Sequence, residues 1–337
     1  MINKFLNTIS RAGLNGFFFL LIGTIFLAWL VPSWGLKENP LHLPQIAEYG
    51  VSLIFLFYGI KLDPKSLISG LSNWRLHLVV QASTFILFPL IVITMKRVFP
   101  AYLSTMLGLG IFYLATLPST VSSSVVLVSI AGGNLPSAIF NASISSIIGI
   151  FITPLWMSGV LQKTLGVFDI GHTIFKLCLE ILLPVVLGLI LHKKLGNWAA
   201  RYKTGLRNFD QFIILLIVFT SFCESFSGNM FKGLSIPELF LLGALMLLFF
   251  FLVFGLMDLL SAWFGFNRGD KITVLFCGSK KSLVQGAVMG KVMFPDQAML
   301  GVVLLPLMLY HALQLLAGST IANAMGNRIK EQSRIPA

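Results

Sequence analysis

The chain has 337 residues, of which 56% are hydrophobic and 11% are charged, and its formal net charge is +12. A soluble domain has about 25% charged residues, so this composition excludes an ordinary soluble fold and indicates a membrane protein. Basic residues in short loops orient membrane helices, which explains the positive charge better than nucleic-acid binding does, so we expect no nucleic-acid partner.

Long apolar segments predict an all-α polytopic membrane protein. A transmembrane helix needs roughly 20 apolar residues to cross a hydrocarbon core of about 30 Å. Solid apolar blocks, in place of a weak alternation, favour helices over a membrane barrel. The ten predicted helices cover residues 14–31, 46–60, 77–95, 103–131, 136–161, 174–192, 209–226, 237–264, 271–294 and 297–324.

Two of these helices are interrupted by polar or helix-breaking residues. The fourth contains LPST at residues 117–120, and the ninth contains GSKK at residues 278–281. Lipid cannot satisfy the backbone groups that such breaks release, so the breaks should be buried in protein or line a cavity.

The two breaks are related by a shift of the chain that carries residues 118–120 onto 279–281. The same shift aligns a short helix and polar loop at 46–66 with those at 207–227. Since five helices are an odd number, two five-helix units must face opposite ways. The sequence therefore predicts an inverted repeat of residues 1–161 and 162–337, and paired interrupted helices are typical of a transporter's binding site.

The distribution of basic residues predicts an orientation. With the N-terminus inside, fifteen Lys and Arg residues fall in inward segments and seven in outward segments. This bias predicts that both termini are cytoplasmic and that the protein lies in the cell (inner) membrane.

Lys280 and Lys281 are the two basic residues that lie away from the ends of a predicted span. A lysine at the centre of a span costs roughly 3 kcal/mol, so at least one should meet water, a partner or a substrate. The alternative is that GSKK forms a surface loop.

A half-helix begins after each break, and its free N–H groups attract anions. We expect Ser119 or Thr120 to cap the first of them. If the breaks meet, the predicted substrate-binding residues are Ser119, Thr120, Ser122, Ser123, Ser124, Ser279, Lys280, Lys281, Ser282 and Gln285.

Other polar residues within the spans have two interpretations each. Glu180 is either a counter-charge or proton carrier, or an interfacial or neutralised carboxyl. His311 is either a hydrogen-bonded core residue or part of a proton relay, and Asn141 serves either helix packing or substrate contact.

The sequence has no metal-ligand spacing and no hydrolase or nucleotide-binding motif, so we expect no metal site, no catalytic residue and no enzyme activity.

FCGSKKSL at 276–283, LPSTVSSS at 117–124 and STFILFPL at 83–90 resemble the SBF-like branch of the bile acid:sodium symporter superfamily. This branch includes bacterial transporters of the YfeH type and an orphan member of human solute carrier family ten. The resemblance implies a panel domain of helices 1, 2, 6 and 7. It also implies a core domain of helices 3–5 and 8–10, in which the broken helices 4 and 9 cross.

The resemblance also implies sodium ligands, but this sequence departs from them. The acidic position of the second break falls within residues 279–281, two hydroxyl positions fall on Ala138 and Ala142, and a glutamine position falls on Thr84. We expect no cofactor, and we expect sodium, if it is used, not to be held by these residues. Our hypothesis is that a lysine ammonium fills the space of a sodium ion.

The sequence therefore predicts a secondary active transporter of an organic anion, working by alternating access. The alternative is a membrane regulator or receptor that keeps the transporter fold without transporting. The expected partners are a small anionic substrate and the lipid bilayer; the oligomeric state is left open.

Overall fold

A computed structural model describes residues 16–62, 73–98, 100, 105–165, 169–232, 234–294 and 296–332 of the chain. The side chains of Phe18, Ser122, 163–165 and 328–332 lie outside this description. Within the described ranges all regular structure is helical.

The first half of the described chain reaches the end of the fifth predicted helix. In the third span, three elements follow one another without a gap, and the middle one, η2, is a π-helical turn. The fourth span is divided into two helices. The elements are α2 (Gly16–Leu30), η1 (Pro32–Gly35), α3 (Leu43–Lys61), α5 (Trp74–Ala82), η2 (Ser83–Leu87), α6 (Phe88–Val98), α8 (Met106–Thr116), α9 (Ser122–Ala131) and α10 (Leu135–Leu165).

The second half has a similar plan. Its first span also contains a π-helical turn, η3, and its ninth predicted span is divided. The elements are α11 (Ile170–Leu177), η3 (Cys178–Leu182), α12 (Leu183–Arg201), α13 (Lys203–Ser227), α14 (Ile236–Trp263), α15 (Arg268–Gly278), α16 (Leu283–Met293) and α17 (Gln297–Gln332).

Among the described residues, seven helical segments are long and apolar enough to cross a membrane, and two shorter apolar helices, Phe19–Leu30 and Met106–Thr116, accompany them. The prediction of a polytopic helical membrane protein is therefore confirmed. The count of ten spans and the inverted repeat stay predictions, because the halves of the interrupted helices are each shorter than a full span.

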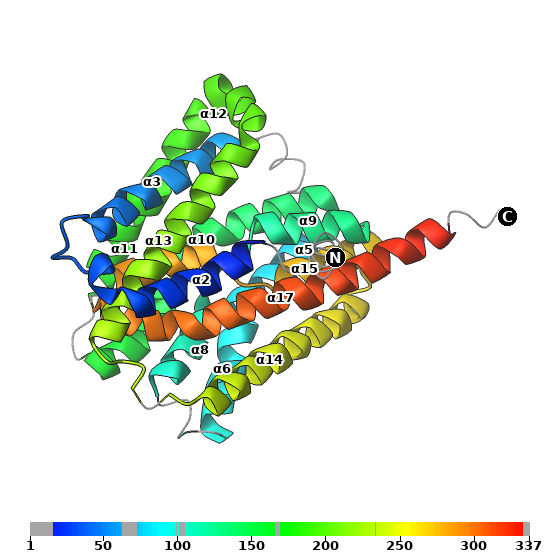
Figure 1. Ribbon diagram of the computed structural model, residues 1–337. Coiled ribbons are helices and arrows are strands. Elements are labelled where there is room, and N and C mark those ends of the chain that lie inside the picture. Colours follow the sequence, from blue (N-terminus) through cyan, green and yellow to red (C-terminus); the bar gives the residue numbers. More distant parts are fainter. Residues whose placement is uncertain are drawn as a thin grey trace, which may run out of the picture.

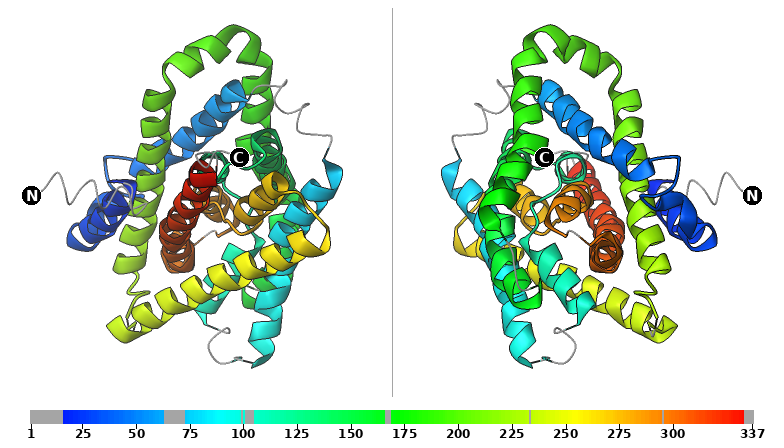
Figure 2. Two further views of the ribbon diagram at one scale, coloured as in Figure 1. Left: turned by 90° about the vertical axis from the view of Figure 1, so that its right-hand side faces the viewer. Right: turned by 90° about the vertical axis from the view of Figure 1, so that its left-hand side faces the viewer.

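Helices α2, α3, α12 and α13 pack with one another on one side of the molecule (Figures 1 and 2). The closest approach joins α3 to α12, where Gly59 faces Gly188. A Cβ added at Gly188 would lie 2.8 Å from the backbone nitrogen of Ile60. Small residues let membrane helices pack backbone to backbone, which explains this tight pair.

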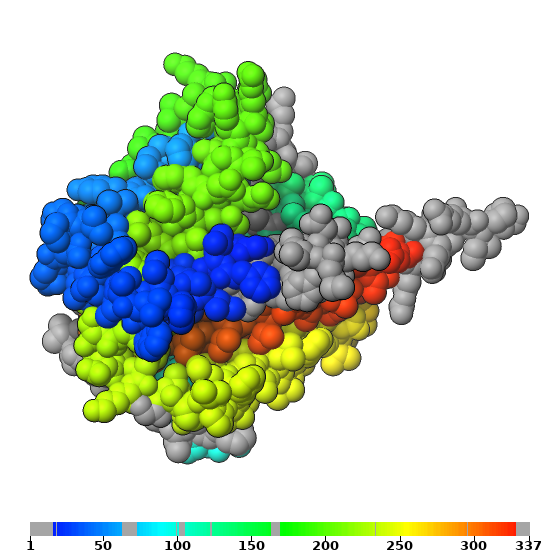
Figure 3. Space-filling model, viewed as in Figure 1, coloured from blue at the N-terminus to red at the C-terminus, as the bar shows by residue number. Residues whose placement is uncertain are grey.

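Helix α17 runs through the middle of the molecule (Figures 1 and 2). It packs against α13 on one side and against α8, α9, α14 and α16 on the other. Figure 3 shows it as a narrow strip between α2 and α14. Leu300, Val303, Leu304 and Leu307 on this helix are fully buried, so α17 connects the two sides of the molecule.

Large apolar side chains cover the outer surfaces of several helices. Ile190 on α12, Phe240 on α14 and Trp263 at the end of α14 are each exposed over more than 60% of their surface. A contiguous apolar exterior of this kind is what a lipid environment requires.

Candidate functional site

The two helix breaks touch each other. Helix α8 ends at Thr116 and α15 ends at Gly278, close to the two predicted positions. The backbone N–H of Ser282 donates to the carbonyl of Pro118 at 3.0 Å. The hydroxyl of Ser119 donates to the carbonyl of Cys277 at 2.8 Å.

Side chains from α10 and α17 satisfy the backbone groups that the breaks release. Ser145 accepts the N–H of Ser119 at 3.0 Å, and Tyr310 donates to the carbonyl of Ser279 at 2.7 Å. The amide of Gln314 accepts from the N–H and donates to the carbonyl of Lys281, at 2.9 and 2.8 Å. The breaks are therefore stabilised by protein, as a lipid environment demands.

The ammonium of Lys281 is fully buried and donates to three backbone carbonyls. It lies 2.6 Å from the oxygen of Thr84 and 2.7 Å from those of Ala115 and Leu117. The same nitrogen lies 4.1 Å from the ring centroid of Phe88, which adds a cation–π contact. Lys281 thus points inward, toward oxygen atoms of two other elements.

All three carbonyls lack a partner in their own helices. In the π-helical turn the N–H of Phe88 donates to the carbonyl of Ser83. The next residue, Pro89, has no N–H to donate to the carbonyl of Thr84, so that carbonyl is left without a helical donor. Ala115 and Leu117 lie at the C-terminal end of α8, where carbonyls lose their helical donors. The ammonium of Lys281 therefore caps two helix irregularities at once.

Lys280 is also fully buried, but its ammonium has a different environment. Its Nζ atom forms no hydrogen bond with the described residues. It lies against α17, where a Cβ added at Gly318 would be 3.3 Å away. Of the two adjacent lysines, Lys280 is the one whose donors are not used by the fold.

The predicted hydroxyls of the first break are mostly engaged with backbone or with one another. Thr120 bonds the hydroxyls of Ser123 at 2.7 Å and Ser124 at 2.9 Å, and Ser124 also donates to the carbonyl of Phe276 at 3.2 Å. The side chain of Ser122 lies outside the described residues.

The expected cap of α9 by Ser119 or Thr120 is wrong. The N-cap is Val121, without a side-chain hydrogen bond, because α9 begins only at Ser122.

The second break is capped by its own residue. Ser282 accepts the N–H of Gln285 at 3.3 Å as the N-cap of α16. The hydroxyl of Ser279 donates to the carbonyl of Leu275 at 2.6 Å. The Oε1 atom of Gln285 is buried and accepts no hydrogen bond from a described residue. Together with Lys280, Gln285 is a polar group at the crossing with unused hydrogen-bonding capacity.

Three further candidates lie in the core around the crossing. The hydroxyl of Thr84 donates to the backbone carbonyl of Val80, one turn earlier in the same span, at 2.8 Å. Asn141 lies 2.9 Å from the Nδ1 atom of His77, and His311 lies 2.9 Å from the amide of Gln314. Each side chain is thus hydrogen-bonded to a nearby group of the protein.

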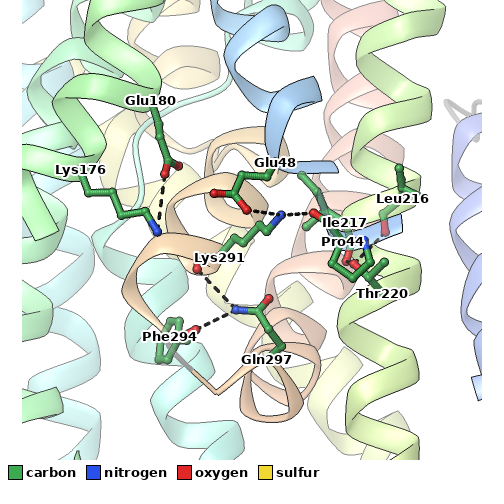
Figure 4. A network of polar contacts seen from close by, with 10 residues as sticks. All are labelled: Pro44, Glu48, Lys176, Glu180, Leu216, Ile217, Thr220, Lys291, Phe294 and Gln297. Atoms are coloured by element: carbon green, nitrogen blue, oxygen red, sulfur yellow. Dashed lines mark hydrogen bonds and ion pairs between the residues drawn. The ribbon is translucent and has the colours of Figure 1, made fainter. Parts of the chain in front are cut away.

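Glu180 lies elsewhere, on a cavity of about 560 Å³ lined by residues of α3, α11, η3, α13, α16 and α17. Figure 4 shows its charged contacts. Glu180 forms an ion pair with Lys176 at 3.6 Å, and Lys291 forms one with Glu48 at 3.9 Å. The Nζ atom of Lys291 also donates to the carbonyl of Pro44 at 2.6 Å.

Lys291 therefore connects α16, which begins at the second break, to α3 on the opposite side of the cavity. The lining also includes Lys37 and Asp169, which belong to segments predicted to face outward.

The model of the SBF-like CPA transporter family matches residues 15–327. The chain belongs to this family. The resemblance inferred from the FCGSKKSL motif is confirmed, and the chain is a multi-pass membrane protein of a transporter family.

Several relatives align over nearly their whole length. An uncharacterized protein of Pseudomonas aeruginosa is 37% identical over 318 residues, which is 93% of both chains. The Escherichia coli protein YfeH, whose name describes it as a proposed symporter, is 34% identical over 309 residues, which is 92% of both chains. Sodium/bile acid cotransporter 7 of Danio rerio is 30% identical over 318 residues, covering 93% of this chain and 94% of its own.

The cavity residues Glu48, Lys176 and Lys291 were missed by sequence reasoning. They lie near the ends of predicted spans, where charge is expected for topological reasons. Their convergence depends on how α3, α11 and α16 meet, and no motif in the sequence marks it.

Proposed function

We propose that the protein is a secondary active transporter of an organic anion in the cell (inner) membrane, with both termini cytoplasmic. The observation that carries this proposal is the contact between two interrupted helices in a chain of a transporter family. Interrupted helices that meet inside a membrane protein are the usual place for substrate and coupling ions.

Alternating access would move the α2, α3, α11–α13 side of the molecule relative to the rest. Two features support this: the cavity lies between these two sides, and the crossing of the breaks lies on one of them. Lys280, Ser123 and Gln285 would contact the anion in a conformation that opens the crossing to water, since Lys280 and Gln285 are buried here and Ser123 is only partly exposed.

The residues at the sodium positions implied by the family do not fit sodium. Ala138 and Ala142 have no side-chain oxygen, and the hydroxyl of Thr84 already donates to Val80. The nearby carbonyls of Ala115 and Leu117, which could bind a cation, already accept hydrogen bonds from the ammonium of Lys281. We therefore expect transport without sodium at these positions, with Lys281 in the space of a cation.

A flux assay tests the proposal. The purified chain would be reconstituted in liposomes, and uptake of taurocholate and of small carboxylates would be measured with sodium or with N-methylglucamine outside. We expect anion uptake in both media, and we expect Lys280→Gln to reduce it strongly. Lys271→Gln, at an exposed ion pair with Asp258, is the matched control.

The outcomes separate the alternatives. Strict dependence on sodium would contradict the proposed role of Lys281. Binding of an anion without any flux would instead favour a receptor that keeps the transporter fold. Normal uptake by Lys280→Gln would remove Lys280 from the transport pathway.

A further inference from the structure

The cavity between α3, α11, α13 and α16 has the size and polarity of a ligand site. Its volume of about 560 Å³ lies within the range of small-molecule pockets, about 300–1,000 Å³. Its lining combines lysines and carboxylates from both sides of the molecule with apolar surface, as small-molecule sites do.

Lys291 is the most enclosed cation of this lining. Its side chain is 15% exposed, whereas that of Lys176 is 43% exposed. Its carboxylate partner, Glu48, is distant at 3.9 Å and half exposed, so the pair is weak. An anionic group of a ligand could therefore approach the ammonium of Lys291 in place of Glu48.

The rest of the lining does not suit a purely anionic ligand. Among the described residues it contains three lysines and four acidic residues. Lys176 already pairs with Glu180 on its own helix. Glu224 on α13 also lines the cavity; it lies near Lys37, whose backbone donates a hydrogen bond to it, and within the described residues it forms no ion pair. A ligand with only negative charge would be attracted by Lys291 and repelled by Glu224.

Electrostatic complementarity selects ligands whose charges match those of the site. We propose that this cavity binds a zwitterionic organic acid, with its acidic group at Lys291 and its cationic group at Glu224. The inference rests on the proposed transport function, and it narrows the organic anion of that proposal to an organic acid that also carries a cationic group.

Matched ligands test the charge requirement. Binding to the purified full-length chain would be measured by calorimetry for two sets with a common skeleton: phenylalanine, 3-phenylpropionate and phenethylamine, and 4-aminobutyrate, butyrate and butylamine. In at least one set we expect the zwitterion to bind about tenfold or more tightly than either singly charged analogue, since one charged contact is lost in each.

Two variants should change this preference in different ways. Lys291→Gln removes the contact with the ligand's acidic group and should weaken the binding of the zwitterion and of the acid alike, by about tenfold. Glu224→Gln removes the cation contact and should abolish the preference for the zwitterion over the acid. Lys271→Gln should bind as the wild type does, and a thermal melt of each variant would show that it is folded.

Lys176→Gln serves as a second cation variant if Lys291→Gln fails to fold. Because Lys176 is more exposed than Lys291, its replacement should weaken the binding of the acid less than Lys291→Gln does.

The inference is overturned if neither zwitterion binds, if the acids bind as tightly as the zwitterions, or if both variants bind as the wild type does. None of these binding results decides whether the protein transports anions, because flux in liposomes is measured separately. Conversely, zwitterion binding that depends on Lys291 and Glu224, without flux, would support the site and contradict the transporter.

Discussion

The ammonium of Lys281 lies 2.6 Å from the carbonyl oxygen of Thr84, a residue 197 positions away in the chain. Thr84 is in the π-helical turn before Pro89, where its carbonyl has no helical donor. This bond joins the third span to the second break, and its two companions at Ala115 and Leu117 join both to the first break. One of the two lysines that are costly to bury is therefore a structural element of the crossing.

Lys281→Met should destabilise the protein strongly. The variant leaves three buried carbonyls without their donor, and each costs roughly 1–3 kcal/mol. We expect the melting temperature in detergent to fall on the order of 5–10 °C. Lys271→Met, at an exposed ion pair, is the control and should change it little. Equal melting of both variants would contradict the structural role of Lys281.

Lys280→Met should behave in the opposite way. A buried ammonium without a described hydrogen-bond partner is unfavourable, so its replacement by an apolar side chain should leave the melting temperature unchanged or raise it. Transport of the proposed anion should be lost, because this ammonium is not used by the fold. A fall in melting temperature as large as that of Lys281→Met would show that Lys280 is structural too.

A small ammonium ion should restore the stability of the Lys281→Gly variant. The variant keeps the carbonyls of Thr84, Ala115 and Leu117 and the ring of Phe88 but lacks their cation. Ethylammonium chloride at about 0.1 M should recover a large part of the lost melting temperature, because it supplies three N–H donors. Tetramethylammonium has the same charge without donors and should recover little. Equal effects of both salts would mean that the carbonyls bind no cation.

Gly188→Ala should weaken the packing of α3 on α12. Its methyl group would meet backbone atoms of Leu56 and Ile60, and backbone cannot move aside as a flexible side chain can. We expect a loss of roughly 1–3 kcal/mol of stability, measured by denaturant titration or thermal melting. Gly243→Ala on α14 has no described atom within 4 Å of the new methyl group, so it should be neutral or slightly stabilising.

The interruption of two spans could be predicted from the sequence because its causes are local. Pro118 and Gly278 stand among short polar residues inside otherwise apolar runs, and such residues release backbone groups. The start of α9 could not be predicted in the same way. The hydroxyl of Ser119 is drawn to Cys277, 158 residues away in the chain, and that bond comes from packing.

The different roles of the two lysines could not be predicted from their neighbours in the chain. Lys281 is satisfied by carbonyls that become free only where a π-helical turn precedes Pro89 and where α8 ends. The sequence contains Pro89, but the distance between it and Lys281 is set by tertiary packing. The same limit explains why the pairing of Lys291 with Glu48, far apart in the chain, could not be predicted.

Helix α16 carries Ser282 at its start, bonded to Pro118, and Lys291 near its other end, bonded to Pro44. One end is anchored to the crossing, whereas the other reaches α3 through a single side chain. Since α16 is only 11 residues long, about 16 Å separate these two links. A ligand that displaces Lys291 from Pro44 would therefore act on α3 and on the crossing of the breaks through one short helix.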